Sequence, residues 1–166
     1  QTCALPIFYD KFQKIASEVN GKFNINYSDE VPNIAIFVSK QNHCLIDLLW
    51  RVRNGELKMN VPLIISNHRD LQNIANDFNA KFIYIDNFSF SKTDVEKQIL
   101  THLDAYDIDL VVLAKYMQIL SDSFLQKFSS IINIHHSFLP AFKGAQPYHR
   151  AWKRGVKLIG ATAHYV

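Results

Sequence analysis

The sequence has 166 residues, of which 48% are hydrophobic and 20% are charged, the ordinary balance of a globular domain. Its net charge of +3 is small and its lysines are scattered, which argues against nucleic acid as a partner. Two cysteines exclude a disulfide framework and a cysteine-rich zinc site. No apolar run approaches the roughly 20 residues that span a bilayer, so no membrane partner is expected. Because no secretory signal is visible, we expect a cytoplasmic protein, or an organellar one if the source is eukaryotic.

The beginning of the chain differs from the rest. Residues 1–7 read like the translation of a sequencing-adapter oligonucleotide, and we set them aside as an expected artefact, with a genuine short β-strand as the alternative. Residues 8–19 carry apolar side chains at helical spacing, and residues 23–27 alternate like a short strand. One helix and one strand cannot bury their apolar faces alone. We therefore expect residues 8–30 to be the tail of a truncated N-terminal domain.

From residue 33 onward, predicted strands alternate with predicted helices. The predicted strands lie at 33–40, 61–66, 81–85, 110–113, 131–135 and 158–165. The predicted helices lie at 43–53, 70–78, 92–106, 121–128 and near 147–154. The first strand is apolar along most of its length, which is typical of a strand covered on both faces. We predict an α/β fold for residues 31–166, a Rossmann-like, doubly wound and mostly parallel sheet.

In such sheets, ligands bind beyond the carboxyl ends of the strands. Residues 39–44, after the first predicted strand, contain no glycine, so a cradle of backbone amides for a phosphate is not expected there. Asn133 and His135 lie at the end of the fifth predicted strand, on the same face because strand residues alternate. An amide can hydrogen-bond a developing oxyanion and an imidazole can move a proton, so the pair suits acyl chemistry. The alternative for a lone Asn-x-His pair is a strand end that meets water.

Longer motifs around this pair resemble those of formyltetrahydrofolate deformylases. Asn-Ile-His-His-Ser-Phe-Leu-Pro at 133–140, with the following residues to 149, resembles the family's active-site segment. Leu-Ala-Lys-Tyr-Met-Gln-Ile-Leu-Ser at 113–121 resembles its folate-binding strand and loop. With further matches at 38–45, 65–68 and 160–166, the resemblance extends over residues 8–166.

The resemblance implies a formyltransferase fold, preceded by the remnant of an ACT-type α+β domain. It implies hydrolysis of 10-formyltetrahydrofolate to formate and tetrahydrofolate, which supplies formate for purine biosynthesis and balances one-carbon pools. No cofactor is implied, because the folate is the substrate. A homo-oligomer is expected, although no motif of the sequence carries that expectation.

The resemblance also implies roles for individual residues. Asn133 would polarise the formyl oxygen, and His135 would transfer protons together with a water and an aspartate. In the family this aspartate lies beyond Val166, so we expect residues 31–166 to be an incomplete catalytic domain and the 166-residue chain itself to be inactive. Substrate contacts are implied at Leu113, Lys115, Tyr116, Met117, Ile119, His136, Ser137, Gly144 and Gln146.

Two alternatives stay open. The first is transfer of the formyl group to an amine, as in glycinamide ribonucleotide transformylase, which is similar in fold. That family typically carries a glycine-rich phosphate loop after strand one, and a proline where His136 stands here. The second alternative is a folate-binding or sensing module without catalysis, suggested by the missing aspartate.

Seven histidines invite a metal hypothesis, which the spacing does not support. His135 and His136 are adjacent and would point to opposite faces of a strand, and no His-x-x-x-His motif or carboxylate cluster accompanies them. We therefore predict no metal site. His164 is expected to be a packed core residue. Cys44 opens a predicted helix, where a lowered thiol pKa is possible, although a small buried residue is its more usual role.

Overall fold

A computed structural model describes residues 5–23, 25, 30–135 and 147–166, and divides the chain into two compact units, residues 1–31 and 32–166. In the first unit, α1 (Leu5–Glu18) begins within the residues set aside above, so a strand is wrong for residues 5–7. The ring of Phe23 packs against those of Tyr9 and Phe12, with centroids 5.3 and 6.0 Å apart. The strand expected at 23–27 is wrong at Phe23 and Ile25, because neither pairs with a strand in the described part of the chain.

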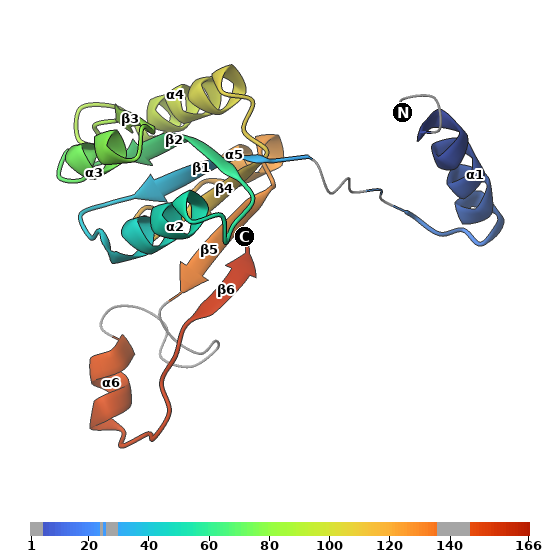
Figure 1. The fold of residues 1–166 in the computed structure, drawn as a ribbon. Helices are drawn as coiled ribbons and strands as arrows, with labels where there is room; N and C mark the ends of the chain where they lie inside the picture. The colour runs from blue at the N-terminus through green and yellow to red at the C-terminus, as the bar shows by residue number, and fades with distance from the viewer. Residues whose placement is uncertain (1–4, 24, 26–29, 136–146) are drawn as a thin grey trace. The chain divides into compact units, whose positions relative to one another are not determined.

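The second unit is a six-stranded sheet with helices on both faces (Figure 1). Its strands are β1 (Asn33–Val38), β2 (Asn60–Ser66), β3 (Lys81–Tyr84), β4 (Leu110–Leu113), β5 (Ile131–His135) and β6 (Thr162–Tyr165). Its helices are α2 (His43–Arg53), α3 (Gln72–Asp77), α4 (Lys92–Ala105), α5 (Asp122–Lys127) and α6 (Pro147–Lys153). The order across the sheet is β3-β2-β1-β4-β5-β6, with β1 to β5 parallel and β6 antiparallel to β5. The predicted doubly wound, mostly parallel α/β sheet is confirmed.

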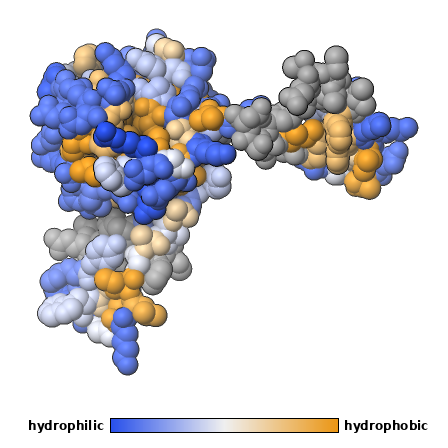
Figure 2. Space-filling model, in the orientation of Figure 1, coloured by the Kyte–Doolittle hydropathy of each residue, from blue (hydrophilic) through white to orange (hydrophobic). Residues whose placement is uncertain are grey.

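All the helices and strands predicted in this unit are present, and the largest difference is at β6. The sequence predicts a strand from residue 158, whereas β6 begins at Thr162. The reason is pairing. Strand β5 ends at His135, whose partner in β6 is Thr162, so residues 158–161 have no partner in β5. Leu158 and Ile159 are instead exposed. Figure 2 shows hydrophobic side chains at the surface of this C-terminal part of the chain.

The alternation of side chains along β1 explains why this strand is apolar from Ile34 to Val38. Ala35 and Phe37 join a core cluster with α4 and α5, whereas Ile34, Ile36 and Val38 join a second cluster with α2 and α3. Each face of the strand is therefore covered by a helical layer. An amphipathic strand would leave polar side chains in one of the two clusters, where burying each would cost free energy.

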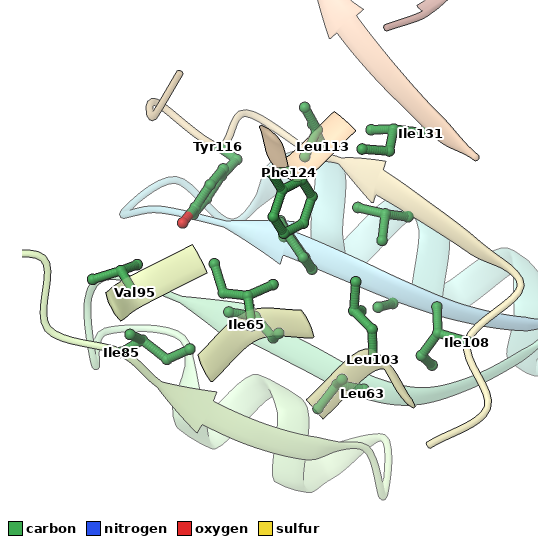
Figure 3. Close-up of a cluster of buried hydrophobic side chains, with 14 residues drawn as sticks. Leu63, Ile65, Ile85, Val95, Leu103, Ile108, Leu113, Tyr116, Phe124 and Ile131 are labelled. Atoms are coloured by element: carbon green, nitrogen blue, oxygen red, sulfur yellow. The ribbon is translucent and has the colours of Figure 1, made fainter. Parts of the chain in front are cut away.

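The cluster beneath α4 and α5 contains Leu113 and Tyr116, two residues with predicted substrate contacts (Figure 3). Val95 and Leu103 of α4 and Phe124 of α5 pack on Ile65 and Leu113 of the sheet. Ser121 caps the start of helix α5, since its hydroxyl accepts a hydrogen bond from the Phe124 amide at 3.2 Å. None of the described helices is both long and apolar enough to cross a bilayer.

Candidate active site

The order in which the chain adds strands to the sheet reverses between β1 and β4. From β1 the chain adds β2 and β3 on one side, and then crosses to the other side to add β4 and β5. The loops after the carboxyl ends of β1 and β4 therefore diverge, and ligands of open α/β sheets bind at such a switch point. Ser39 follows β1 here, and Lys115 and Met117 follow β4.

The strand register places Asn133 next to this point. Phe37 of β1 pairs with Leu113 of β4, Leu113 with Asn133 of β5, and Asn133 with His164 of β6. These four residues form one row across the sheet, close to its carboxyl edge. The amide of Asn133 thus lies beside the end of β4, the strand whose following segment carries the predicted folate contacts.

His164 is in direct contact with Asn133. Its Nε2 lies 3.4 Å from the Asn133 Nδ2, and its Nδ1 lies 2.9 Å from the Tyr165 carbonyl oxygen. A carbonyl oxygen only accepts, so Nδ1 carries the proton, and in the neutral ring Nε2 then accepts from Asn133. An amide nitrogen has two N–H groups, so this contact uses one donor and leaves the second for another acceptor.

His164 is therefore not the packed core residue expected from the sequence. It is half-buried, and it lies on β6, the edge strand of the described sheet. His164 lies next to Asn133 because β6 pairs antiparallel with β5. Nothing in the local pattern of residues 158–165 indicates that pairing.

His135 is the last residue of β5 and lies on the same face as Asn133, as strand alternation predicts. It is half-buried and pairs with Thr162. The structure therefore brings the two predicted catalytic residues together at the carboxyl end of one strand. The other predicted contacts of this segment, His136, Ser137, Gly144 and Gln146, lie outside the described residues.

The predicted contacts after β4 divide into buried and exposed side chains. Leu113 and Tyr116 are only 6% and 8% exposed and belong to the core, so a ligand can reach mainly their backbone groups. Met117 and Ile119 are 63% and 86% exposed and are available to a ligand through their side chains. Together with the start of α4, residues 116–120 line a hollow of about 380 Å³.

Lys115 turns the chain sharply after β4. Its φ of 62° lies in the left-handed region, where a residue with a Cβ is strained. Its ammonium group donates a hydrogen bond to the Gln41 side-chain oxygen.

Glu96 holds Ser121, the residue that follows the chain segment 116–120. The Glu96 carboxylate accepts hydrogen bonds from the Ser121 amide at 2.8 Å and from the Ser121 hydroxyl. Glu96 is only 7% exposed. Its buried carboxylate is satisfied by the hydrogen bonds from Ser121 and by Lys92, whose Nζ lies 4.0 Å from the Glu96 Oε1.

Burial raises the pKa of Tyr116 to about 12 from an ordinary value of 10.0, against the opposing effect of a hydrogen bond from Asn87. The ring of Tyr116 packs edge-on against Phe37, with centroids 5.3 Å apart.

This shift predicts how stability falls in alkali. Between pH 10 and about 12, the unfolded chain ionises Tyr116 while the folded chain keeps it neutral. Its stabilising effect is thus fully present below pH 10 and is lost as the pH rises through about 12, for a total of about 2–3 kcal/mol. Urea unfolding at about pH 9 and about pH 11.5 should therefore show a smaller loss of stability for Tyr116→Phe than for the wild type. An equal loss in the two proteins would contradict the shift.

Among the described residues, the site has neither a nucleophilic cysteine nor a metal cluster. Burial raises the pKa of the Cys44 thiol, and Asp47 adds to this effect while Lys115 opposes it, so the thiol is protonated at neutral pH. Within the described ranges, no three His, Cys, Asp or Glu side chains are grouped closely enough to hold a metal ion.

The comparisons with known proteins agree with this fold. Residues 32–166 match the formyl transferase family, and the chain belongs to that family. It is 52% identical over 160 residues to a formyltetrahydrofolate deformylase of Synechocystis sp., a match that covers 96% of this chain and 56% of that protein. The resemblance predicted from the sequence is confirmed.

Solved structures of deformylases and of glycinamide ribonucleotide transformylases are similar to this chain in fold. A formyltetrahydrofolate deformylase from Pseudomonas syringae has a TM-score of 0.90 and 39% identity, over 98% of this chain and 55% of that one. Glycinamide ribonucleotide transformylase 1 from Symbiobacterium toebii has a TM-score of 0.79 and 30% identity, over 87% of this chain and 70% of that one. The chain spans about half the length of the deformylases that it matches.

Proposed function

We propose that the protein hydrolyses 10-formyltetrahydrofolate to formate and tetrahydrofolate. The observation that carries this proposal is the pairing of Asn133 and His135 on one face of β5, next to the segment that follows β4. The names of relatives at 52% and 39% identity support a deformylase over a transferase.

The proposed reaction starts when the oxygen of a water molecule adds to the formyl carbon. The carbonyl oxygen then carries negative charge, which a hydrogen bond from the Asn133 amide stabilises. When this intermediate collapses, the bond between the formyl carbon and N10 breaks, N10 takes up a proton, and formic acid leaves and loses its proton to solvent as formate. His135 accepts the proton of the attacking water and returns one to N10, a role typically worth about 10²–10⁴ in rate.

His164 contributes to this mechanism by orienting Asn133. An amide can rotate to present either its oxygen or its nitrogen, and only the nitrogen stabilises an oxyanion. The unprotonated Nε2 of His164 accepts a hydrogen bond from the Asn133 Nδ2. This hydrogen bond keeps the amide nitrogen, and not the amide oxygen, on the side of Asn133 that faces His164. The site thus has its donor in place before substrate arrives.

We propose that the folate lies against the segment after β4. Backbone groups near Leu113 and Tyr116 and the exposed side chains of Met117 and Ile119 would contact it. Contacts from Lys115, and from the residues outside the described ranges named above, are part of the same proposal.

Wider features of the protein are proposals as well. The proposed folate substrate fits a cytoplasmic protein that supplies formate for purine biosynthesis. We also propose a homo-oligomer, and light scattering of the purified protein would test the oligomeric state. Residues 8–30 would belong to an ACT-type domain, a proposal supported by the aromatic side chains that α1 exposes, Phe8, Tyr9 and Phe12.

The decisive test is whether water is the acceptor. Expressed in the full reading frame that contains this chain, the protein should release formate from 10-formyltetrahydrofolate with no amine added and with a chelator present. The reason is that residues 39–44 lack glycine and offer no cradle of amides for a nucleotide phosphate. Formate should be measured by a coupled dehydrogenase assay. Turnover that requires added glycinamide ribonucleotide would assign the protein to the transferases instead.

A further inference from the structure

Hydrogen bonds join the segment that follows β4 to the end of β1. The predicted roles of the site residues do not account for these hydrogen bonds. The Ala114 amide donates to the Phe37 carbonyl oxygen at 2.9 Å, which continues the sheet pairing. The Met117 amide then donates to the Ser39 hydroxyl oxygen at 3.2 Å. Met117 lies beyond the sheet, so without Ser39 its amide would lose this partner.

The Ser39 hydroxyl is itself oriented by Asn67, which follows β2. Ser39 donates its single hydroxyl proton to the Asn67 side-chain oxygen at 2.8 Å, so a lone pair faces the Met117 amide. Both side chains are buried, with 6% and 7% exposure. A buried polar group that loses its partner costs about 1–3 kcal/mol, so this chain of three groups strongly favours a single arrangement.

This arrangement opposes a local strain. Lys115, between Ala114 and Met117, has the left-handed φ of 62°. A residue with a Cβ is held in this conformation only when its surroundings determine it, at a cost of about 1–3 kcal/mol. Hydrogen bonds on either side of Lys115 supply that constraint: the Ala114 amide before it donates to the Phe37 carbonyl oxygen, and the Met117 amide after it donates to the Ser39 hydroxyl oxygen.

We propose that Ser39, oriented by Asn67, is a positioning residue that fixes the segment 114–120 for substrate. This inference rests on the proposed function, because it assumes that the segment binds the folate. Ser39 touches the Met117 amide and acts through the position of that backbone. Fixed geometry matters because a displacement of about 1 Å can cost about 10² in rate.

The test compares Ser39→Ala with a matched control, Ser66→Ala. Ser66 is also a fully buried serine, at the end of β2, and its hydroxyl contacts the His68 amide at 3.1 Å and the Ser39 carbonyl oxygen at 3.5 Å. Neither of these partners lies in the segment 114–120, so Ser66→Ala controls for the loss of a buried hydroxyl. Both variants are made in the full reading frame, and folding is checked by thermal unfolding.

Two readouts are needed. Hydrogen exchange of the Met117 amide should accelerate roughly tenfold in Ser39→Ala, as expected for a lost hydrogen bond of about 1.4 kcal/mol, and should change little in Ser66→Ala. The KM for 10-formyltetrahydrofolate should rise about tenfold in Ser39→Ala only. If Ser39→Ala does not fold, Asn67→Ala replaces it, because that variant keeps the Ser39 oxygen and removes only the acceptor that orients it.

Faster exchange together with a raised KM, both absent in Ser66→Ala, would support the proposal. Faster exchange with an unchanged KM would overturn the positioning role, and unchanged exchange would overturn the contact itself. A wild-type protein that neither binds nor hydrolyses the folate would instead overturn the proposed function, and the exchange comparison would still decide whether Ser39 fixes this segment.

Discussion

Replacing Asn133 with alanine should lower turnover by about 10²–10³, the usual effect of removing one oxyanion donor. The affinity for tetrahydrofolate should change little, because the proposed binding surface is the segment after β4 and the Asn133 amide acts only when charge develops. Steady-state kinetics with 10-formyltetrahydrofolate, together with equilibrium binding of tetrahydrofolate, would measure the two effects separately.

A matched control is Asn73→Ala, which removes an exposed amide on α3 and should leave turnover unchanged. If Asn133→Ala kept its turnover and only bound the folate more weakly, Asn133 would be a ground-state contact. The hydrogen bond from Asn133 to His164 would then be a structural feature of the sheet edge with no catalytic role.

Replacing Phe37 with alanine should lower the free energy of unfolding by about 3–5 kcal/mol. The Phe37 side chain is fully buried in the centre of the sheet, and its removal leaves a cavity between β1 and the Tyr116 ring. At the lower limit, the ratio of folded to unfolded protein falls more than 100-fold. Urea unfolding followed by circular dichroism would measure the change.

Phe37→Leu is the control, since it keeps an apolar side chain and should cost much less than Phe37→Ala. If both variants cost the same, loss of the aromatic edge contact with Tyr116 would be the main effect, and cavity formation would not. If neither variant lost stability, Phe37 would not support the core between the sheet and α4.

The elements of the fold could be predicted because each carries a local signal. The apolar run of β1 and the spacing of Val95, Ile99 and Leu103 in α4 depend only on neighbouring residues. Strand alternation likewise placed Asn133 and His135 on one face. These predictions need no knowledge of what the segment pairs with.

Features that depend on distant pairing could not be predicted in this way. The antiparallel β6, the contact of His164 with Asn133, and the link from Ser39 to Met117 each join residues at least 27 positions apart. Local periodicity does not record such pairs. The left-handed Lys115 was missed for a related reason: sequence rules expect glycine or asparagine at such a turn, and here contacts with β1 hold a lysine in it.

The position of β1 in the middle of the sheet also has a consequence for how the chain folds during synthesis. The Asn33 amide at the start of β1 bonds to the Asp109 carboxylate, 76 residues later in the chain. At about 5–20 residues per second, β1 waits about 4–15 s for β4 to be made. During this interval, the hydrogen-bonding edge of a strand that is apolar from Ile34 to Val38 stays open to other chains. Chaperone binding to the nascent chain should therefore peak between the synthesis of β1 and that of β4.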